Sequence, residues 1–205
     1  MLIVITSPDR IENESELINQ LFAEGLEILH LRKPTWIKPA YESLLKSIPP
    51  EHKRKVVLHQ FHELASKYNI KGLHLREENR LQISVTELVE LKKELKRKNL
   101  TISSSFHSSE EIERHKNVFD YVFLSPVFDS ISKPDYLRND ALGRMNDKWK
   151  STIKTDIIAL GGIDASNISK TKEMGFNGAA VLGAIWKKPE MALKTFKQIR
   201  TNYLK

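Results

Sequence analysis

The chain has 205 residues, of which 40% are apolar, a length and composition that suit one folded domain spanning residues 1–205. It contains no cysteine, which excludes disulfides, thiolate metal sites and a cysteine nucleophile. The first apolar run, 2–6, is too short for a signal peptide, and no later run reaches the length of a membrane span. We therefore expect a cytoplasmic protein that does not act at a membrane.

The formal net charge of +7 comes in large part from the lysines and arginine in 92–98, on the polar face of a predicted helix. Nucleic-acid binding requires basic residues interleaved with exposed aromatic ones, and the sequence has no such stripe. Small anionic molecules are therefore the expected partners. No oligomeric state follows from the sequence.

Short apolar runs alternate regularly with helical patterns along the whole chain. Eight strands, each followed by a helix, favour parallel pairing with right-handed crossovers and therefore a single (β/α)8 TIM barrel. An open doubly wound sheet is the alternative, and the count of eight favours closure. The predicted strands are 2–6, 27–31, 55–59, 71–75, 101–105, 121–125, 156–160 and 178–182.

Capping patterns mark the helix starts. Asn13 with Glu16, and Ser108 with Glu111, have the spacing of a capping box, and Gly25 is placed to end the first helix. The inner stripe of the fourth predicted helix is Val85, Leu88, Val89 and Leu95.

The catalytic groups of a (β/α)8 barrel come from the C-terminal ends of its strands and the loops that follow. Strand alternation places His30 and Arg32 on one face of strand 27–31, and Ser105 and His107 on one face of strand 101–105. Both sets end in a polar residue at the expected catalytic rim.

Glycines follow the last two predicted strands, as Gly161-Gly162 and as Gly183 with Ala184. Glycines at these positions let backbone N–H groups approach a phosphate, and a short following helix adds its N-terminal partial charge. The alternative is a pair of ordinary turns that require a positive φ.

A polar segment follows the sixth predicted strand and contains Ser130, Ser132 and Lys133. Two hydroxyls and a lysine within four residues can donate several hydrogen bonds to phosphate oxygens. The alternative is a polar surface loop without a ligand.

Five segments resemble thiamine phosphate synthase and its relative, the TenI-type thiazole tautomerase, in the order and spacing of that family: 30–33, 72–75, 105–108, 125–133 and 159–163. The resemblance covers nearly the whole chain. It implies a barrel that binds a phosphorylated thiazole near the loops after strands six to eight. In the synthase it also implies a pyrimidine diphosphate bound with Mg²⁺.

The chain departs from the synthase pattern where that pattern provides ligands for the metal and the diphosphate. His59-Gln60 stands where the synthase has Asn-Asp, and Asn79 stands at the second aspartate. Mg²⁺ prefers carboxylate oxygens, so both metal ligands are lost. Pro34 replaces a lysine and His30 a glutamine, while the neighbouring Lys33 is expected to start on the other face of the strand.

Several histidines lie near strand ends. His59 and His62 form an H-x-x-H pattern, which is a weak metal signal because catalytic zinc sites take three protein ligands. His74 is interpreted as a packed barrel residue. His107 matches the histidine to which the tautomerase resemblance assigns proton transfer, and histidine both accepts and returns a proton near neutral pH.

These observations lead to the hypothesis of a tautomerase that aromatises a thiazole carboxylate phosphate by moving a proton, without a metal or other cofactor. His107 is the acid/base and Arg32 holds the substrate carboxylate. The predicted phosphate ligands are Ser130, Ser132, Lys133, Gly161, Gly162, Gly183 and Ala184. The other predicted pocket residues are His30, Lys33, His59, Gln60, His74, Asn79 and Ser105.

Two alternatives stay open. The first is a divergent thiamine phosphate synthase that uses Mg²⁺, or in which Arg76 and Arg80 replace the charge of the metal. The second is a barrel that binds thiamine intermediates without catalysis, because one fold is compatible with all three functions.

Overall fold

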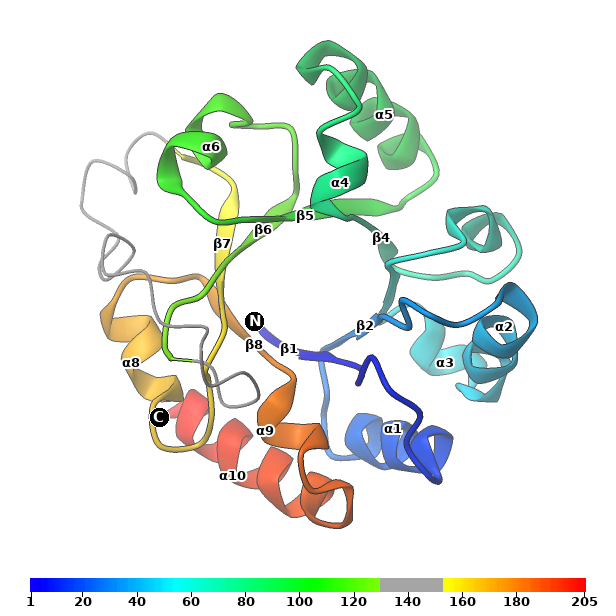
Figure 1. Cartoon of the computed structure of the whole chain (residues 1–205), viewed down its shortest axis with the longest axis vertical. Helices are drawn as coiled ribbons and strands as arrows, with labels where there is room; N and C mark the ends of the chain where they lie inside the picture. The colour runs from blue at the N-terminus through cyan, green and yellow to red at the C-terminus, as the bar shows by residue number, and fades with distance from the viewer. Residues whose placement is uncertain (130–152) are drawn as a thin grey trace.

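The computed structural model describes residues 1–129 and 153–205. Eight parallel strands form a closed barrel in which each strand pairs with its neighbours in chain order and β8 returns to β1 (Figure 1). The predicted TIM barrel is confirmed, and every strand boundary falls within one residue of its prediction. The strands are β1 (Leu2–Ile5), β2 (Ile28–Leu31), β3 (Val56–Leu58), β4 (Gly72–Leu75), β5 (Thr101–Phe106), β6 (Tyr121–Leu124), β7 (Asp156–Leu160) and β8 (Gly178–Val181).

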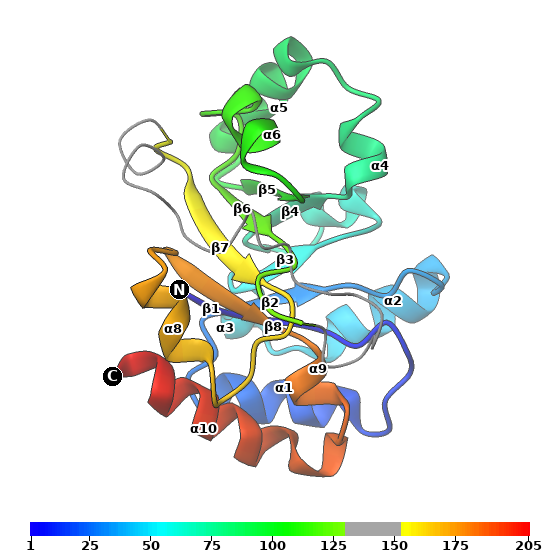
Figure 2. The same cartoon turned by 60° about the vertical axis from the view of Figure 1, so that its left-hand side comes forward.

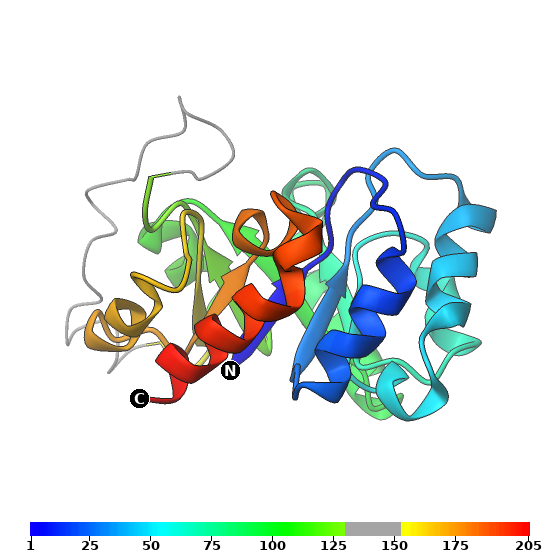
Figure 3. The same cartoon turned by 90° about the horizontal axis from the view of Figure 1, so that it is seen from below.

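Helices surround the barrel, and α1 and α10 lie side by side beneath β1 and β8 (Figures 2 and 3). Between β3 and β4 the crossover contains only a 3-10 turn, η1 (His62–Ser66). No helix of the described residues is long and apolar enough to cross a membrane. The helices are α1 (Glu14–Ala23), α2 (Lys38–Ser47), α3 (Pro50–Lys53), α4 (Glu77–Arg80), α5 (Val85–Arg97), α6 (Ser109–Arg114), α8 (Ile168–Glu173), α9 (Gly183–Trp186) and α10 (Ala192–Leu204), with a second 3-10 turn, η3 (Pro189–Met191).

Most strands are apolar on both faces because one face packs against helices and the other fills the barrel. Alternate residues such as Ile3 and Ile5 of β1 belong to a separate inner cluster with Phe123 of β6. The register pairs Ile5 with His30, so His30 lies among these inner residues and is fully buried. Polar groups on the inner face therefore reach the barrel interior and not the helix layer.

The first helix does not begin as predicted. Asn13 adopts a left-handed conformation, with φ of 54°, and its side chain caps no N–H group, so the predicted capping box with Glu16 is wrong. Gly25, with φ of 89°, does follow the end of α1. At α6 the Ser108 hydroxyl accepts a hydrogen bond from the Glu111 N–H at 3.3 Å, which confirms that half of the predicted box.

A complete capping box opens α5 instead, where the sequence analysis placed none. The Ser84 hydroxyl accepts from the Glu87 N–H at 3.2 Å, and the Glu87 carboxylate accepts from the Ser84 N–H at 2.9 Å. Leu88 and Leu95 face the core as predicted, whereas Val85 is 45% exposed. Val85 is the first residue of its helix, where a side chain projects beyond the layer that packs on the sheet.

Candidate active site

At the C-terminal ends of the strands, two hydrogen bonds join the residues that follow β1 and β2. The Thr6 hydroxyl accepts a hydrogen bond from the Arg32 N–H at 2.8 Å and donates one to the Arg32 carbonyl at 2.9 Å. This pair of bonds holds the backbone of Arg32, so the direction in which its side chain leaves the strand is determined. Thr6 is a site residue that the sequence analysis did not identify, because its partner lies 26 residues away.

Two guanidinium groups lie near one another at this rim. Burial, together with the neighbouring Arg76, lowers the pKa of the Arg32 guanidinium. Arg76 forms an ion pair with Glu78 at 2.6 Å, while its buried Nε has no hydrogen-bond partner. No carboxylate of residues 1–129 or 153–205 lies within 4 Å of the Arg32 guanidinium. Because Arg32 remains charged at neutral pH, this side of the mouth suits a bound anion.

His107 lies immediately after β5 with 45% of its side chain exposed. Its Nδ1 is 2.9 Å from the carbonyl of Ser125, and since a carbonyl only accepts, Nδ1 carries the proton. In the neutral ring Nε2 is therefore unprotonated and free to accept a proton. The Glu77 carboxylate at the start of α4 lies 3.7 Å from Nε2. Glu77 was not identified from the sequence, although an acidic residue just after a barrel strand is a candidate for the active site.

The Gly161-Gly162 turn packs directly on the loop after β6. Both residues have positive φ, 99° and 65°. A Cβ at Gly162 would lie 2.2 Å from the carbonyl oxygen of Asp129, so no larger residue fits there. The Phe128 N–H donates to the Gly161 carbonyl at 3.2 Å. The two glycines form a turn with positive φ, as the alternative of an ordinary turn requires. The turn also brings the loops after β6 and β7 into contact.

The predicted turn after β8 is the start of α9. Leu182 is its N-cap, so the N–H groups of Gly183 and Ala184 open the helix without acceptors inside it. The indole N–H of Trp186 donates to the Ile5 carbonyl at 2.7 Å, which fixes α9 against β1. These N–H groups lie beyond the end of β8, next in the barrel to the turn after β7.

The remaining predicted phosphate ligands, Ser130, Ser132 and Lys133, lie outside the described residues. Their part in phosphate binding stays a prediction from the sequence.

A network of hydrogen-bonded polar side chains lies inside the barrel. His30 Nδ1 is 2.9 Å from His59 Nε2, and His30 Nε2 is 2.6 Å from the hydroxyl of Tyr121. His74 lies 2.9 Å from the Ser103 hydroxyl and 3.1 Å from that of Ser105. The three histidines are at most 5% exposed, so they lie below the open mouth. His74 is a packed barrel residue, as predicted.

Burial is the main reason why these histidines are neutral. It lowers the pKa of His74 to about 3, with His62 and Arg32 adding to the effect. Burial and neighbouring cations and histidines lower the pKa values of His30 and His59 well below 6.5. Each ring therefore has one N–H donor and one acceptor nitrogen near pH 7.

The two positions that replace the expected Mg²⁺ ligands do not suit that ion. The Gln60 amide oxygen accepts a hydrogen bond from the Lys33 N–H at 3.0 Å, and Asn79 is exposed on α4. Mg²⁺ requires near-octahedral oxygen ligands, usually one or two carboxylates. Neither residue supplies a carboxylate, so we derive no step that uses Mg²⁺.

Lys33 does not belong to the pocket, which corrects the prediction. Its ammonium group forms a fully buried ion pair with Glu14 of α1 at 2.6 Å and donates to the Asp9 carbonyl at 2.8 Å. It also lies over the Trp36 ring, 4.6 Å from its centroid. As the strand alternation indicates, the side chain starts on the outer face of the barrel, away from Arg32.

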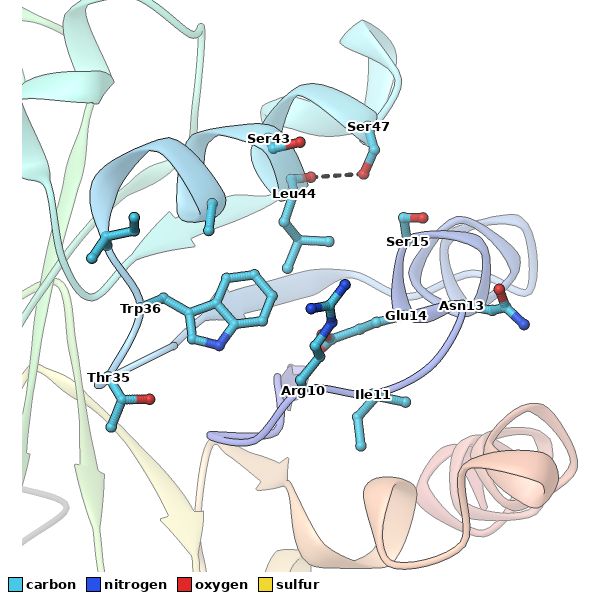
Figure 4. Close-up of a pocket in the computed structure, with 12 residues that line it drawn as sticks. Arg10, Ile11, Asn13, Glu14, Ser15, Thr35, Trp36, Ser43, Leu44 and Ser47 are labelled. Carbon is cyan, nitrogen blue, oxygen red and sulfur yellow. Dashed lines mark hydrogen bonds between the residues drawn. The ribbon is translucent and has the colours of Figure 1, made fainter.

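A cavity of about 640 Å³ lies outside the strands, between the start of α1 and helix α2 (Figure 4). Trp36 and Glu14 face one another across it, with Arg10 between them. None of the predicted site residues lines this cavity. The chemical groups that match the predicted reaction are at the strand ends, so we place the candidate active site there.

Comparison with known proteins gives consistent matches. A family model described as thiamine monophosphate synthase matches residues 2–185. The crystal structure of thiamine phosphate pyrophosphorylase from Bacteroides thetaiotaomicron superposes with a TM-score of 0.75 at 31% identity, covering 98% of this chain and 96% of that one. The thiamine-phosphate synthase of Clostridium acetobutylicum is 26% identical over 172 residues, 82% of this chain and 77% of the relative. The match to the Listeria welshimeri enzyme of the same name is 31% identical over 88 residues, 42% of each chain.

Proposed function

The chain belongs to the thiamine monophosphate synthase family, whose model matches residues 2–185, and we propose that within this thiamine-biosynthesis family it acts as a thiazole tautomerase. It binds a phosphorylated thiazole carboxylate at the barrel mouth and makes the ring aromatic by removing a proton from one carbon and returning one to another. The substrate keeps its composition, so no second substrate and no oxidant is required.

His107 is the observation on which the proposal depends most. Its Nδ1 donates to the Ser125 carbonyl, which leaves Nε2 as the acceptor. A histidine with one tautomer held in place accepts a proton at Nε2 and returns it from the same atom. Glu77, 3.7 Å from Nε2, stabilises the imidazolium form during this exchange.

The anion-binding groups support a phosphorylated, carboxylated substrate. The turns at Gly161-Gly162 and Gly183 provide backbone N–H groups for the phosphate, and the sequence predicts that Ser130, Ser132 and Lys133 add side-chain donors. Arg32 follows β2, which only β1 separates from β8 in the barrel; it has no carboxylate partner among the described residues and binds the substrate carboxylate. The substrate thus extends from the β7 and β8 turns toward β2.

A second candidate function is a divergent thiamine phosphate synthase, the activity named for the relatives. The proximity of Arg32 and Arg76 favours it, because two guanidinium groups suit a diphosphate. The synthase reaction also needs charge neutralisation that a metal normally supplies, and Gln60 and Asn79 lack the carboxylates to hold Mg²⁺. The tautomerase reaction makes no such demand, so the residues present suit it better.

The experiment that separates these functions supplies both sets of substrates to the purified protein. One reaction contains the non-aromatic thiazole carboxylate phosphate alone, and thiazole absorbance is followed. The other contains hydroxymethylpyrimidine diphosphate, thiazole phosphate and Mg²⁺, and thiamine phosphate is quantified. The proposal expects turnover only in the first reaction. Thiamine phosphate formation without aromatisation would establish the synthase, and binding without either product would establish a non-catalytic barrel.

A further inference from the structure

Three histidines that are far apart in sequence meet inside the barrel. His30 comes from β2, His59 follows β3, and His74 lies on β4, all within the buried interior. One ring nitrogen of each lies within 4.8 Å of those of the other two. No other group of three histidine or carboxylate side chains in the described part of the chain meets this condition.

The distance between the ring nitrogens of His30 and His59 is close to the distance between two nitrogen ligands of one metal ion. His30 Nδ1 and His59 Nε2 are 2.9 Å apart, whereas two imidazoles bound tetrahedrally at about 2.0–2.1 Å have nitrogens about 3.3 Å apart. The rings of His59 and His74 are stacked, with centroids 4.1 Å apart. Rotation of one of these rings about its Cβ–Cγ bond is therefore needed before both nitrogens point to a shared ion.

Hydroxyl groups hold the outer nitrogens of two of the rings. His30 Nε2 is 2.6 Å from the Tyr121 hydroxyl, so its Nδ1 faces His59. His74 Nδ1 is 2.9 Å from the Ser103 hydroxyl, so its Nε2 faces Ser105. Metal-binding histidines commonly donate their second N–H to such a partner, which orients the ring and increases its basicity.

The chemistry of the set selects the kind of ion. Metals bind the neutral imidazole, and these buried rings are neutral near pH 7. Imidazole suits zinc, copper and nickel, whereas Mg²⁺ prefers oxygen ligands. The set contains no carboxylate, so its chemistry differs from that of a magnesium site.

We propose that His30, His59 and His74 form a binding site for a divalent transition-metal ion of the zinc class, with three imidazole ligands. A water molecule is the fourth ligand, as in catalytic zinc sites. For His74 Nε2 to bind the ion, it exchanges its present contact with the Ser105 hydroxyl, 3.1 Å away, for the metal. The site is independent of the proposed tautomerase reaction, because it concerns metal binding alone and not the proton transfer at His107.

The test uses the metals themselves as probes. Chelator-treated full-length protein is titrated with Co²⁺ while the visible spectrum is recorded, and with Zn²⁺ in a calorimeter. We expect one equivalent of either ion to bind, with the visible bands of four-coordinate cobalt. Substitution of one ligand, His30→Gln, His59→Gln or His74→Gln, removes these bands. His52→Gln keeps them, because His52 lies on α3 and its ring stacks on Phe22, away from the three histidines.

Tyr121→Phe provides a second test, because it leaves all three histidine ligands in place. Loss of the hydroxyl beside His30 lowers the affinity for Zn²⁺ roughly 10–100-fold, the usual effect of losing such a partner. Absence of stoichiometric binding to the wild-type protein would overturn the proposal. So would binding that survives all three ligand substitutions, or binding lost in His62→Gln but kept in His30→Gln, which would place the ion on the H-x-x-H segment instead.

Discussion

Acidification destabilises this fold through its buried histidines, and His74 gives the clearest case. In the folded protein burial lowers its pKa to about 3, against an ordinary value of 6.5. Between these values the unfolded chain binds a proton that the folded protein does not. The free energy of unfolding therefore falls as pH falls through this window and is unaffected by His74 above it.

The magnitude follows from the two pKa values. Between pH 7 and pH 5 the unfolded His74 becomes almost fully protonated, which lowers the free energy of unfolding by about 2 kcal/mol. His30 and His59 have pKa values lowered in the same direction, so acidification destabilises the fold through them with the same sign. The contribution of His74 alone is a substantial fraction of the total stability of a typical domain, about 5–15 kcal/mol.

The assay is urea-induced unfolding of metal-free protein at pH 7 and pH 5, followed by circular dichroism. Buried Glu14 acts in the opposite direction, because its raised pKa favours the folded state at low pH. Comparison with His74→Gln isolates the histidine contribution: the variant should lose about 2 kcal/mol of the pH dependence. Equal pH dependence in the two proteins would refute the reasoning, since it would mean that His74 takes up its proton without unfolding.

Three further predictions concern the residues at the C-terminal ends of the strands. Gly162→Ala should lower the free energy of unfolding by about 1–3 kcal/mol, because φ is 65° and the new Cβ meets the Asp129 carbonyl. The same substitution should weaken the binding of thiazole phosphate measured by calorimetry, and unchanged binding would show that this turn does not hold the phosphate. Turnover should not depend on Mg²⁺, and activity that is lost in chelator and restored by Mg²⁺ would count against the tautomerase assignment. Gln60→Asp combined with Asn79→Asp should raise the affinity for Mg²⁺ in titrations without producing thiamine phosphate, since Pro34 is unchanged; appearance of that product would favour the synthase.

The barrel could be predicted because each strand is a local feature. An apolar run of four to six residues followed by a helical pattern is visible in any one segment, and eight repeats leave few topologies. The helix starts were less predictable. Asn13 has the spacing of an N-cap, but a left-handed backbone turns its side chain away, and the sequence does not specify that backbone conformation.

The candidate site was predicted one residue at a time and not as an arrangement. His30, His59 and His74 were each expected in the pocket, but their convergence depends on the register between strands, such as His30 beside Val57. Lys33 illustrates the opposite case. Its partner Glu14 lies 19 residues earlier on another element, so nothing near Lys33 in the sequence indicates a buried ion pair.

The most direct test of the central claim is the rate of thiazole aromatisation by His107→Asn, measured together with its affinity for thiazole phosphate. The asparagine keeps a polar group near Ser125 but cannot accept and return a proton. We predict a rate roughly 10²–10⁴-fold below wild type, with affinity changed little and with His52→Asn as an unaffected control. A rate for His107→Asn within about threefold of wild type, equivalent to about 0.7 kcal/mol, would contradict the account and remove His107 from the mechanism.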